Sequence, residues 1–152
     1  MSLEILTLSG VARLRADEDE KLTVYDDATG LPIVPGSHVI GHPTIGVGRA
    51  LDVHGMSETE TDMLLADDLA SLNATLSHYS WFPTQPSPRR DVLIMMAFQM
   101  GIGGLLKFPV MLGDFAAENY AGAALAMLNS IWAQQTPERA KRLAQIMREG
   151  HY

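Results

Sequence analysis

Two acidic residues near the start of the chain, Glu18 and Asp27, have the types and spacing to hydrolyse a glycosidic bond. Glu18 closes a predicted helix, and Asp27 stands where a predicted hairpin opens, in the segment VYDDATG. Such hydrolysis needs one carboxylic acid to protonate the leaving oxygen and a second carboxylate to activate water or attack the sugar. Because the chain holds eighteen Asp and Glu residues, a solvent-exposed role is the better interpretation of this pair taken alone.

The elements that would position these two acids follow from the apolar pattern. Residues 3–16 place apolar side chains at a roughly helical period and predict a short opening helix. From Leu22 to Ala50, proline and glycine interrupt the short β-prone segments LTVYD, PIVPG, HVIG and TIGVG. This alternation of β-prone segments with turn residues predicts a small hairpin-based sheet, the only strand-forming region expected in the chain.

The remaining two thirds of the sequence predict helices. Ser57 and Glu60 form a capping-box pattern, and leucines then recur on one face, so a long helix is expected over about 57–79. The segment PRRDVLIMMAFQMG is apolar nearly all round, which is typical of a helix at the centre of a helical lobe, and Gly101 is placed to end it.

Three further segments, FPVMLGDF, AENYAGAALAMLNS and TPERAKRLAQIMREG, predict short helices. In the last of them Thr136 is expected as the N-cap, with Pro137 at the first helical position. The methionines of LIMMAFQM, together with Met111 and Met127, are expected to fill the core.

The predicted fold class is α+β, with a small β-hairpin lobe joined by a long helix to an all-helical C-terminal lobe. We expect one domain over 1–152, with a small N-terminal lobe of about 15–60 and the connecting helix over 57–79. The helical lobe should cover about 80–152 and also take in the N-terminal helix. A cleft between two lobes is the default place for a binding site.

Composition excludes several classes of function. The chain has 152 residues, of which 47% are hydrophobic, so one compact domain can bury its own core. It has no cysteine, which excludes disulfides and thiolate zinc sites, and its five histidines lack metal-ligand spacing. A net charge of −7 argues against nucleic-acid binding. No metal and no organic cofactor are therefore expected.

The N-terminal sequence has neither a basic segment nor a long apolar one, so it fits neither a signal peptide nor a membrane span. We expect a protein made in the cytoplasm, with no stable membrane insertion.

Five short motifs occur in a fixed order: LRADE, the second Asp of YDDATG, PTIGVGR, FQMG and IWAQQTPERAKR. In this order they resemble the phage-type lysozymes of glycoside hydrolase family 24, which include the lysozymes of T-even phages. The resemblance runs from about Leu14 to the last helix. Each motif is modest alone, but together they are highly specific, and they imply a lysozyme-like fold.

The resemblance also implies roles for particular residues. Glu18 corresponds to the catalytic acid of the family, Asp27 to its second carboxylate, and Thr44 to the threonine that helps to hold the attacking water. Tyr25 looks like the tyrosine beside the active-site acid. By residue type alone, Thr44 would be an ordinary strand threonine, and packing explains Tyr25 equally well.

Three residues of the helical lobe match supporting positions in the family. Gln99 resembles a glutamine that lines the cleft, and Trp132 resembles its packing partner, although a tryptophan here also suits the core. Arg139 matches the arginine that pairs with the catalytic glutamate. By residue type alone it would be one more cation on a basic helix face.

The sequence also departs from the family pattern. Sixteen residues separate Asp27 from Thr44, many more than in the T-even phage enzymes, so segment 28–43 is expected to form a mobile lip over the cleft. Asp19 replaces the glycine that commonly follows the catalytic glutamate. Arg49 stands where histidine often follows the TIGxG motif, and the chain is acidic where many relatives are basic.

The expected activity is that of a muramidase, which hydrolyses the β-1,4 bond between N-acetylmuramic acid and N-acetylglucosamine in peptidoglycan. Inversion is expected because the resemblance makes Thr44 a holder of water. A monomer acting in phage or prophage lysis is implied, reaching the wall through a membrane lesion made by a separate phage protein or carried in a virion. The alternatives are a lytic transglycosylase on the same bond and an inactive wall-binding module.

Overall fold

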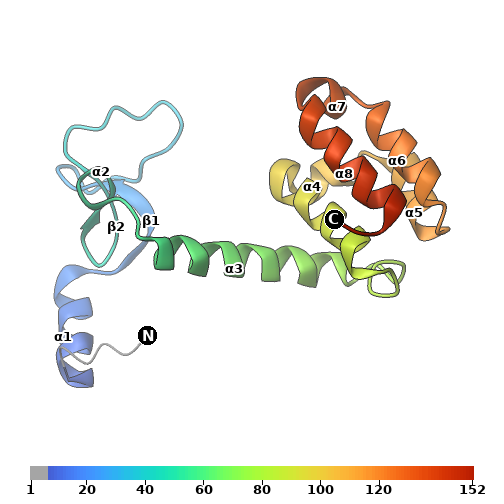
Figure 1. The fold of residues 1–152 in the computed structure, drawn as a ribbon. Coiled ribbons are helices and arrows are strands. Elements are labelled where there is room, and N and C mark those ends of the chain that lie inside the picture. The colour runs from blue at the N-terminus through green and yellow to red at the C-terminus, as the bar shows by residue number, and fades with distance from the viewer. Residues whose placement is uncertain (1–6) are drawn as a thin grey trace. The chain divides into compact units, whose positions relative to one another are not determined.

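The computed structural model describes residues 7–152, which form two compact units, one ending at Thr61 and the other beginning at Asp62 (Figure 1). The first unit holds the sheet, two helices and the start of a third, and the second unit is entirely helical. The predicted α+β, lysozyme-like fold class is confirmed.

Helix α1 (Leu8–Glu18) opens the first unit. The Thr7 hydroxyl accepts a hydrogen bond from the backbone N–H of Gly10 at 3.1 Å, which satisfies one of the unpaired donors of the first turn. The start of the predicted helix, residues 3–6, lies outside the described residues. The helix ends at Asp19, which has left-handed backbone angles of φ 54 and ψ 75.

An antiparallel sheet follows, with strand order β1 (Lys21–Asp26), β2 (Pro43–Gly46) and β3 (Arg49–Ala50). Tyr25 on β1 stands directly opposite Thr44 on β2. Of the four β-prone segments, LTVYD and TIGVG contribute to strands. The prediction was wrong for HVIG, and PIVPG supplies only an isolated bridge. Its two prolines have no N–H to donate to a neighbouring strand.

The long segment 28–42 is hydrogen-bonded to β1 and to Asp27 near both of its ends. Ile33 N–H donates to the Val24 carbonyl at 3.0 Å, and Asp26 N–H donates to the Leu31 carbonyl at the same distance. At the far end, Asp27 N–H donates to the His42 carbonyl at 3.1 Å. Both ends of the segment are therefore tied to the sheet by backbone hydrogen bonds.

A single helical turn, α2 (Leu51–His54), leads to α3 (Glu58–Leu76). The capping box is confirmed, because Ser57 N–H donates to Glu60 Oε2 at 2.7 Å and Glu60 N–H donates to the Ser57 hydroxyl at 3.3 Å. The helix ends at Leu76 rather than near residue 79. The N–H groups of His78 and Tyr79 donate to carbonyls three residues back instead of four, which is the tighter hydrogen bonding of a 3₁₀ turn.

The second unit contains the rest of α3 and five more helices, which are α4 (Ser87–Leu105), α5 (Pro109–Ala116), α6 (Tyr120–Leu128), α7 (Ile131–Gln135) and α8 (Pro137–Glu149). Gly101, with φ 74 and ψ 164, interrupts α4 where the sequence predicts its end, and a short helical turn follows. Pro137 is the first residue of α8 as predicted. Thr136 is the N-cap residue of α8 as predicted, but its side chain makes no capping hydrogen bond, because its hydroxyl donates to the Trp132 carbonyl at 3.0 Å instead.

The core of the protein lies in the second unit. Its largest fully buried side chains come from the end of α3, the loop after it, and α4, α5, α6 and α8; they are Leu76, Phe82, Val92, Leu93, Met96, Leu105, Met111, Phe115, Met127 and Met147. The flexible methionine side chains fill this interior as the sequence predicts.

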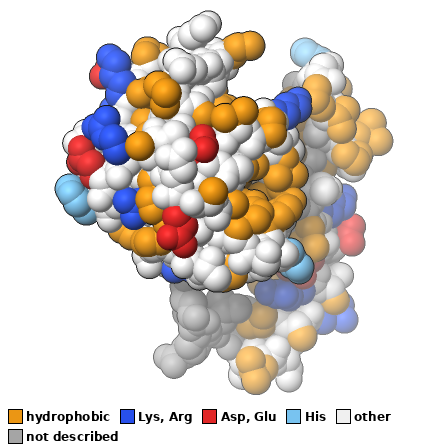
Figure 2. Space-filling model, turned by 90° about the vertical axis from the view of Figure 1, so that its right-hand side faces the viewer, with side chains coloured by type: hydrophobic (Ala, Val, Ile, Leu, Met, Phe, Trp, Pro, Cys, Tyr) orange, Lys and Arg blue, Asp and Glu red, His pale blue; other side chains and the backbone are white. Residues whose placement is uncertain are grey.

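The helical unit also leaves large hydrophobic side chains in solvent, among them Val110, Leu125 and Ile131. On the face that Figure 2 turns to the viewer, hydrophobic side chains gather between charged ones.

Within residues 7–152, no single helix has the length and hydrophobicity to cross a membrane. Helices α4 and α5 meet these criteria only as a pair bent by 115°.

Candidate active site

The predicted site residues divide between the two units. The first unit holds the candidates for catalysis and one neighbour, Glu18, Tyr25, Asp27 and Thr44. The second holds the supporting residues Gln99, Trp132 and Arg139.

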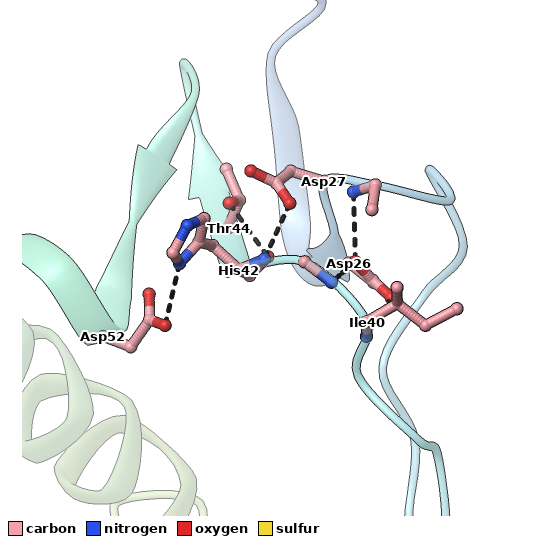
Figure 3. Close-up of polar contacts among 8 residues, drawn as sticks. Asp26, Asp27, Ile40, His42, Thr44 and Asp52 are labelled. Carbon is pink, nitrogen blue, oxygen red and sulfur yellow. Dashed lines mark hydrogen bonds and ion pairs between the residues drawn. The ribbon is translucent and has the colours of Figure 1, made fainter.

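Asp27 and Thr44 are brought together by the backbone of His42 (Figure 3). The N–H of His42 donates to Asp27 Oδ1 at 2.7 Å, and its carbonyl accepts from the Thr44 hydroxyl at 3.1 Å. Asp27 is exposed, whereas Thr44 is 3% exposed. One residue of the long insertion thus links the two side chains.

Asp26 is a buried carboxylate that sequence reasoning did not assign to the site. Its oxygens accept backbone hydrogen bonds from Ile40 and Gly41, both at 2.9 Å, and from Ala28 at 3.0 Å. The hydrogen bond from Ile40 contributes most to lowering the pKa of Asp26, against the opposing effect of burial. Its signal in the sequence was the paired Asp in VYDDATG, whose members point to opposite faces of a strand end.

Gly41 explains how the insertion approaches both acids so closely. A Cβ atom at this position would collide with the Asp27 carboxylate and with Ala28. Only glycine leaves room for its own N–H to reach Asp26 while His42 N–H reaches Asp27. Three consecutive N–H groups, from Ile40 to His42, therefore bind two neighbouring carboxylates.

Glu18 occupies the last position of α1, and its side chain is exposed. A Cβ atom built on Gly48, in the turn between β2 and β3, would lie 3.4 Å from Glu18 Oε2. The turn therefore passes directly beside the carboxyl group. Gly48 has φ 74, which favours glycine, so the last glycine of TIGVG is required by the turn itself.

Tyr25 is half-buried, and the ammonium of Lys21 lies 4.2 Å from the centre of its ring. This cation–π contact and the pairing with Thr44 account for the tyrosine through packing within the sheet.

Gln99 and Trp132 form a direct pair in the second unit. The indole N–H of Trp132 donates to Gln99 Oε1 at 3.0 Å. An indole nitrogen can only donate, so this bond fixes which end of the amide faces it and turns the NH₂ end of Gln99 away. Gln99 is exposed and Trp132 is 7% exposed, so a buried ring orients a solvent-facing amide.

Arg139 is exposed on α8, at the edge of a pocket of about 300 Å³ within the second unit. Its lining is otherwise apolar apart from Arg142, with Leu65, Leu69, Met95, Phe98 and Leu143. The pairing of Arg139 with Glu18, which the resemblance implies, stays a prediction.

Two ionic contacts support the sheet. His42 Nδ1 lies 2.9 Å from Asp52 Oδ2 at the start of α2, and this hydrogen bond raises the pKa of His42 and lowers that of Asp52. Arg49 stands where many family members have histidine. Its guanidinium donates to the Gly55 carbonyl at 2.8 and 3.1 Å and forms an ion pair with Glu60 at 3.0 Å. Arg49 therefore joins β3 to the first turn of α3.

Across residues 7–152, no group of three or more His, Asp or Glu side chains is arranged to hold a metal ion. The arrangement in the first unit is one of carboxylates and a hydroxyl, which suits acid–base chemistry on a sugar.

Comparison with known proteins gives several matches. A model of the phage lysozyme family matches residues 18–148. The pre-baseplate central spike protein Gp5 of Enterobacteria phage T4 is 32% identical over 163 residues, an alignment that covers 95% of this chain and 28% of that protein. Two probable T4-type lysozymes of Dictyostelium discoideum, 1 and 2, are 28% and 27% identical over 158 residues, covering 90% of this chain and 92% of each relative.

Proposed function

Because this chain belongs to the phage lysozyme family and is a glycoside hydrolase of the lysozyme kind, we propose that it cleaves peptidoglycan with inversion. The bond cut is the β-1,4 linkage between N-acetylmuramic acid and N-acetylglucosamine. The observation that carries the proposal is the junction at His42, where one backbone residue holds both Asp27 and Thr44.

In the proposed reaction, Glu18 protonates the glycosidic oxygen while Asp27 accepts a proton from the attacking water. The Oδ1 atom of Asp27 already accepts from His42, which leaves Oδ2 to take the proton. Since the Thr44 hydroxyl donates to the His42 carbonyl, its oxygen lone pairs are what it offers to the water. A water that donates to both Thr44 and Asp27 keeps its own lone pair for the anomeric carbon.

Gln99, Trp132 and Arg139 are proposed to support substrate binding from the helical unit. Gln99 would offer its outward NH₂ group to carbonyl or hydroxyl oxygens of the glycan, since its other end is held by Trp132. The role of Arg139 as partner of Glu18 rests on the family resemblance.

The anomeric form of the first product tests inversion. Proton NMR of fresh digests of soluble glycan strands should show the α anomer, and a first-formed β anomer would refute inversion. Mass spectrometry of the same digests separates hydrolysis from lytic transglycosylation, because anhydro-muramic products would identify the latter. Permeabilised cells whose turbidity does not fall would instead support the inactive wall-binding module.

We also propose that the protein acts as a monomer in phage or prophage lysis. It would be made in the host cytoplasm and reach the wall through a lesion made by a separate phage membrane protein. Carriage in the virion is the second candidate, favoured by the similarity to the T4 spike protein. Mass spectrometry of purified virions distinguishes these routes, since only carriage predicts the chain among particle proteins.

A further inference from the structure

The end of the long insertion forms a clasp, defined here as residues 40–42, around Asp26, the last residue of β1, and Asp27, which follows it. Ile40 and Gly41 donate to Asp26, and His42 donates to Asp27. The carboxylate that accepts the first two bonds is buried in the sheet. These bonds therefore hold the backbone of Ile40 and Gly41 close to the end of β1. The third bond then sets the orientation of the exposed Asp27 side chain.

The ring of His42 ties this clasp to a second element. Figure 3 shows the ring directed toward Asp52, the second residue of α2, with a 2.9 Å contact between Nδ1 and Oδ2. Helix α2 follows directly on β3, which pairs with β2. His42 is thus held on one side by its backbone bonds to Asp27 and Thr44, and on the other by its ring.

We propose that His42 is a positioning residue, anchored through Asp52, that sets the geometry of Asp27 and Thr44 for attack by water. The proposal rests on the proposed function, because it assigns a reaction to those two side chains. It makes the insertion part of the site's framework. The backbone N–H and C=O of one residue can hold an acid and a hydroxyl in place only while that residue keeps its orientation, and the ring contact with Asp52 restrains it in addition to the backbone bonds.

The anchor should depend on pH in a definite direction. The groups that face His42 are Asp52 from α2 and Asp27, which follows β1, and both favour the charged imidazolium, so the pKa of His42 is raised. The charge-assisted bond is fully present below the ordinary histidine pKa and is lost as pH rises through the raised value. A neutral ring keeps only the weaker hydrogen bond.

The test compares the full-length wild type with His42→Ala, Asp52→Ala and the double variant, using soluble uncross-linked glycan strands. Each variant should lower kcat about tenfold with little change in KM, since misplacement of reacting groups by a fraction of an ångström costs rate rather than affinity. The double variant should be no worse than either single one. His38→Ala, an exposed histidine of the same insertion, is the matched control and should keep wild-type kcat.

Two further readouts separate positioning from general loss of structure. Exchange of the His42 amide hydrogen should quicken in Asp52→Ala, while amides of the helical unit keep their wild-type rates. The ratio of wild-type to His42→Ala kcat should shrink as pH rises through the folded-state pKa of His42, because the acid limb and base limb common to both proteins cancel in this ratio.

Equal kcat for the wild type and His42→Ala, or additive losses in the double variant, would overturn the positioning role alone. A wild type that cleaves no strands overturns the proposed function and, with it, any role of His42 in catalysis. In that case faster amide exchange in Asp52→Ala would still establish the clasp, so the two failures are distinguishable.

Discussion

Replacing Asp19 with glycine should stabilise the protein, because Asp19 has a backbone conformation that suits glycine. At φ 54 and ψ 75 it ends α1 in the left-handed region, which costs Asp about 1 kcal/mol, the low end of the usual range because Asp tolerates this region better than most residues. Its carboxylate also stands at the negative end of the helix dipole, an unfavourable contact of about 0.3–1 kcal/mol. Both penalties disappear in Asp19→Gly.

Two smaller effects oppose this gain. Glycine makes the unfolded chain more flexible, which costs about 0.4–1 kcal/mol. The contact of Asp19 with Lys21 is 3.9 Å long and its carboxylate is 85% exposed, so it contributes a few tenths of a kcal/mol at most. The balance is a stabilisation of about 0.5 kcal/mol, or about 1–2 °C in melting temperature for a chain of this size.

Thermal unfolding followed by circular dichroism measures this shift, with Asp19→Asn as the matched control. Asparagine removes the charge but keeps a side chain in the left-handed region, so it should gain only the dipole contribution. If Asp19→Gly melts no higher than Asp19→Asn, the backbone is unstrained and the reasoning is refuted. Lysis activity should be unchanged in both variants, since neither alters the proposed catalytic groups.

The remaining predictions concern the site and the insertion. Glu18→Gln should lower the lysis rate by at least about 10²-fold while leaving the melting temperature unchanged, since it removes the proposed proton donor; more than about 1% residual activity would exclude that role. Asp27→Asn should be similarly inactive, and a fully active variant would move the role to Asp26. Because the pKa of Asp26 is lowered on folding, its stabilising effect is present above its ordinary value of 3.8 and lost as pH falls through the folded value, so Asp26→Asn should flatten the acid side of a melting-temperature profile. Shortening residues 34–38 should spare the fold, whereas removing the clasp as well should lower the melting temperature. Arg139→Ala should reduce the lysis rate through lost positioning of Glu18, and an unchanged rate would show that this part of the resemblance does not hold.

Local sequence signals predicted the elements that depend on local chemistry. The capping box at Ser57 and the helix break at Gly101 each depend on one or two nearby residues, and both are confirmed. Thr136 stands at the N-cap position as predicted, but its hydroxyl donates to the Trp132 carbonyl one turn back instead of accepting from a helix N–H, a competing bond that residue type does not reveal.

The clasp could not be predicted from the sequence, because it depends on pairing across the long insertion. Asp26 receives its N–H donors from residues 14 and 15 positions further along, and the contact of His42 with Asp52 spans ten. Periodicity reports which side chains share a face, but it carries no information about which loop returns to them. The order of the family motifs singled out Asp27 and Thr44 as candidates. It did not predict that His42, a residue of the segment between them, is hydrogen-bonded to both.

The dependence of Asp26 on the insertion has an evolutionary consequence. A segment added to a surface loop is ordinarily free to disappear again, since little else relies on it. Here Ile40 and Gly41 of this segment supply N–H donors to the buried carboxylate of Asp26. Without them that charge would lose hydrogen bonds that water cannot replace in a buried position. We therefore expect that a relative can lose these residues only if its position 26 is no longer a buried carboxylate. A relative that keeps the aspartate should keep the donor residues as well.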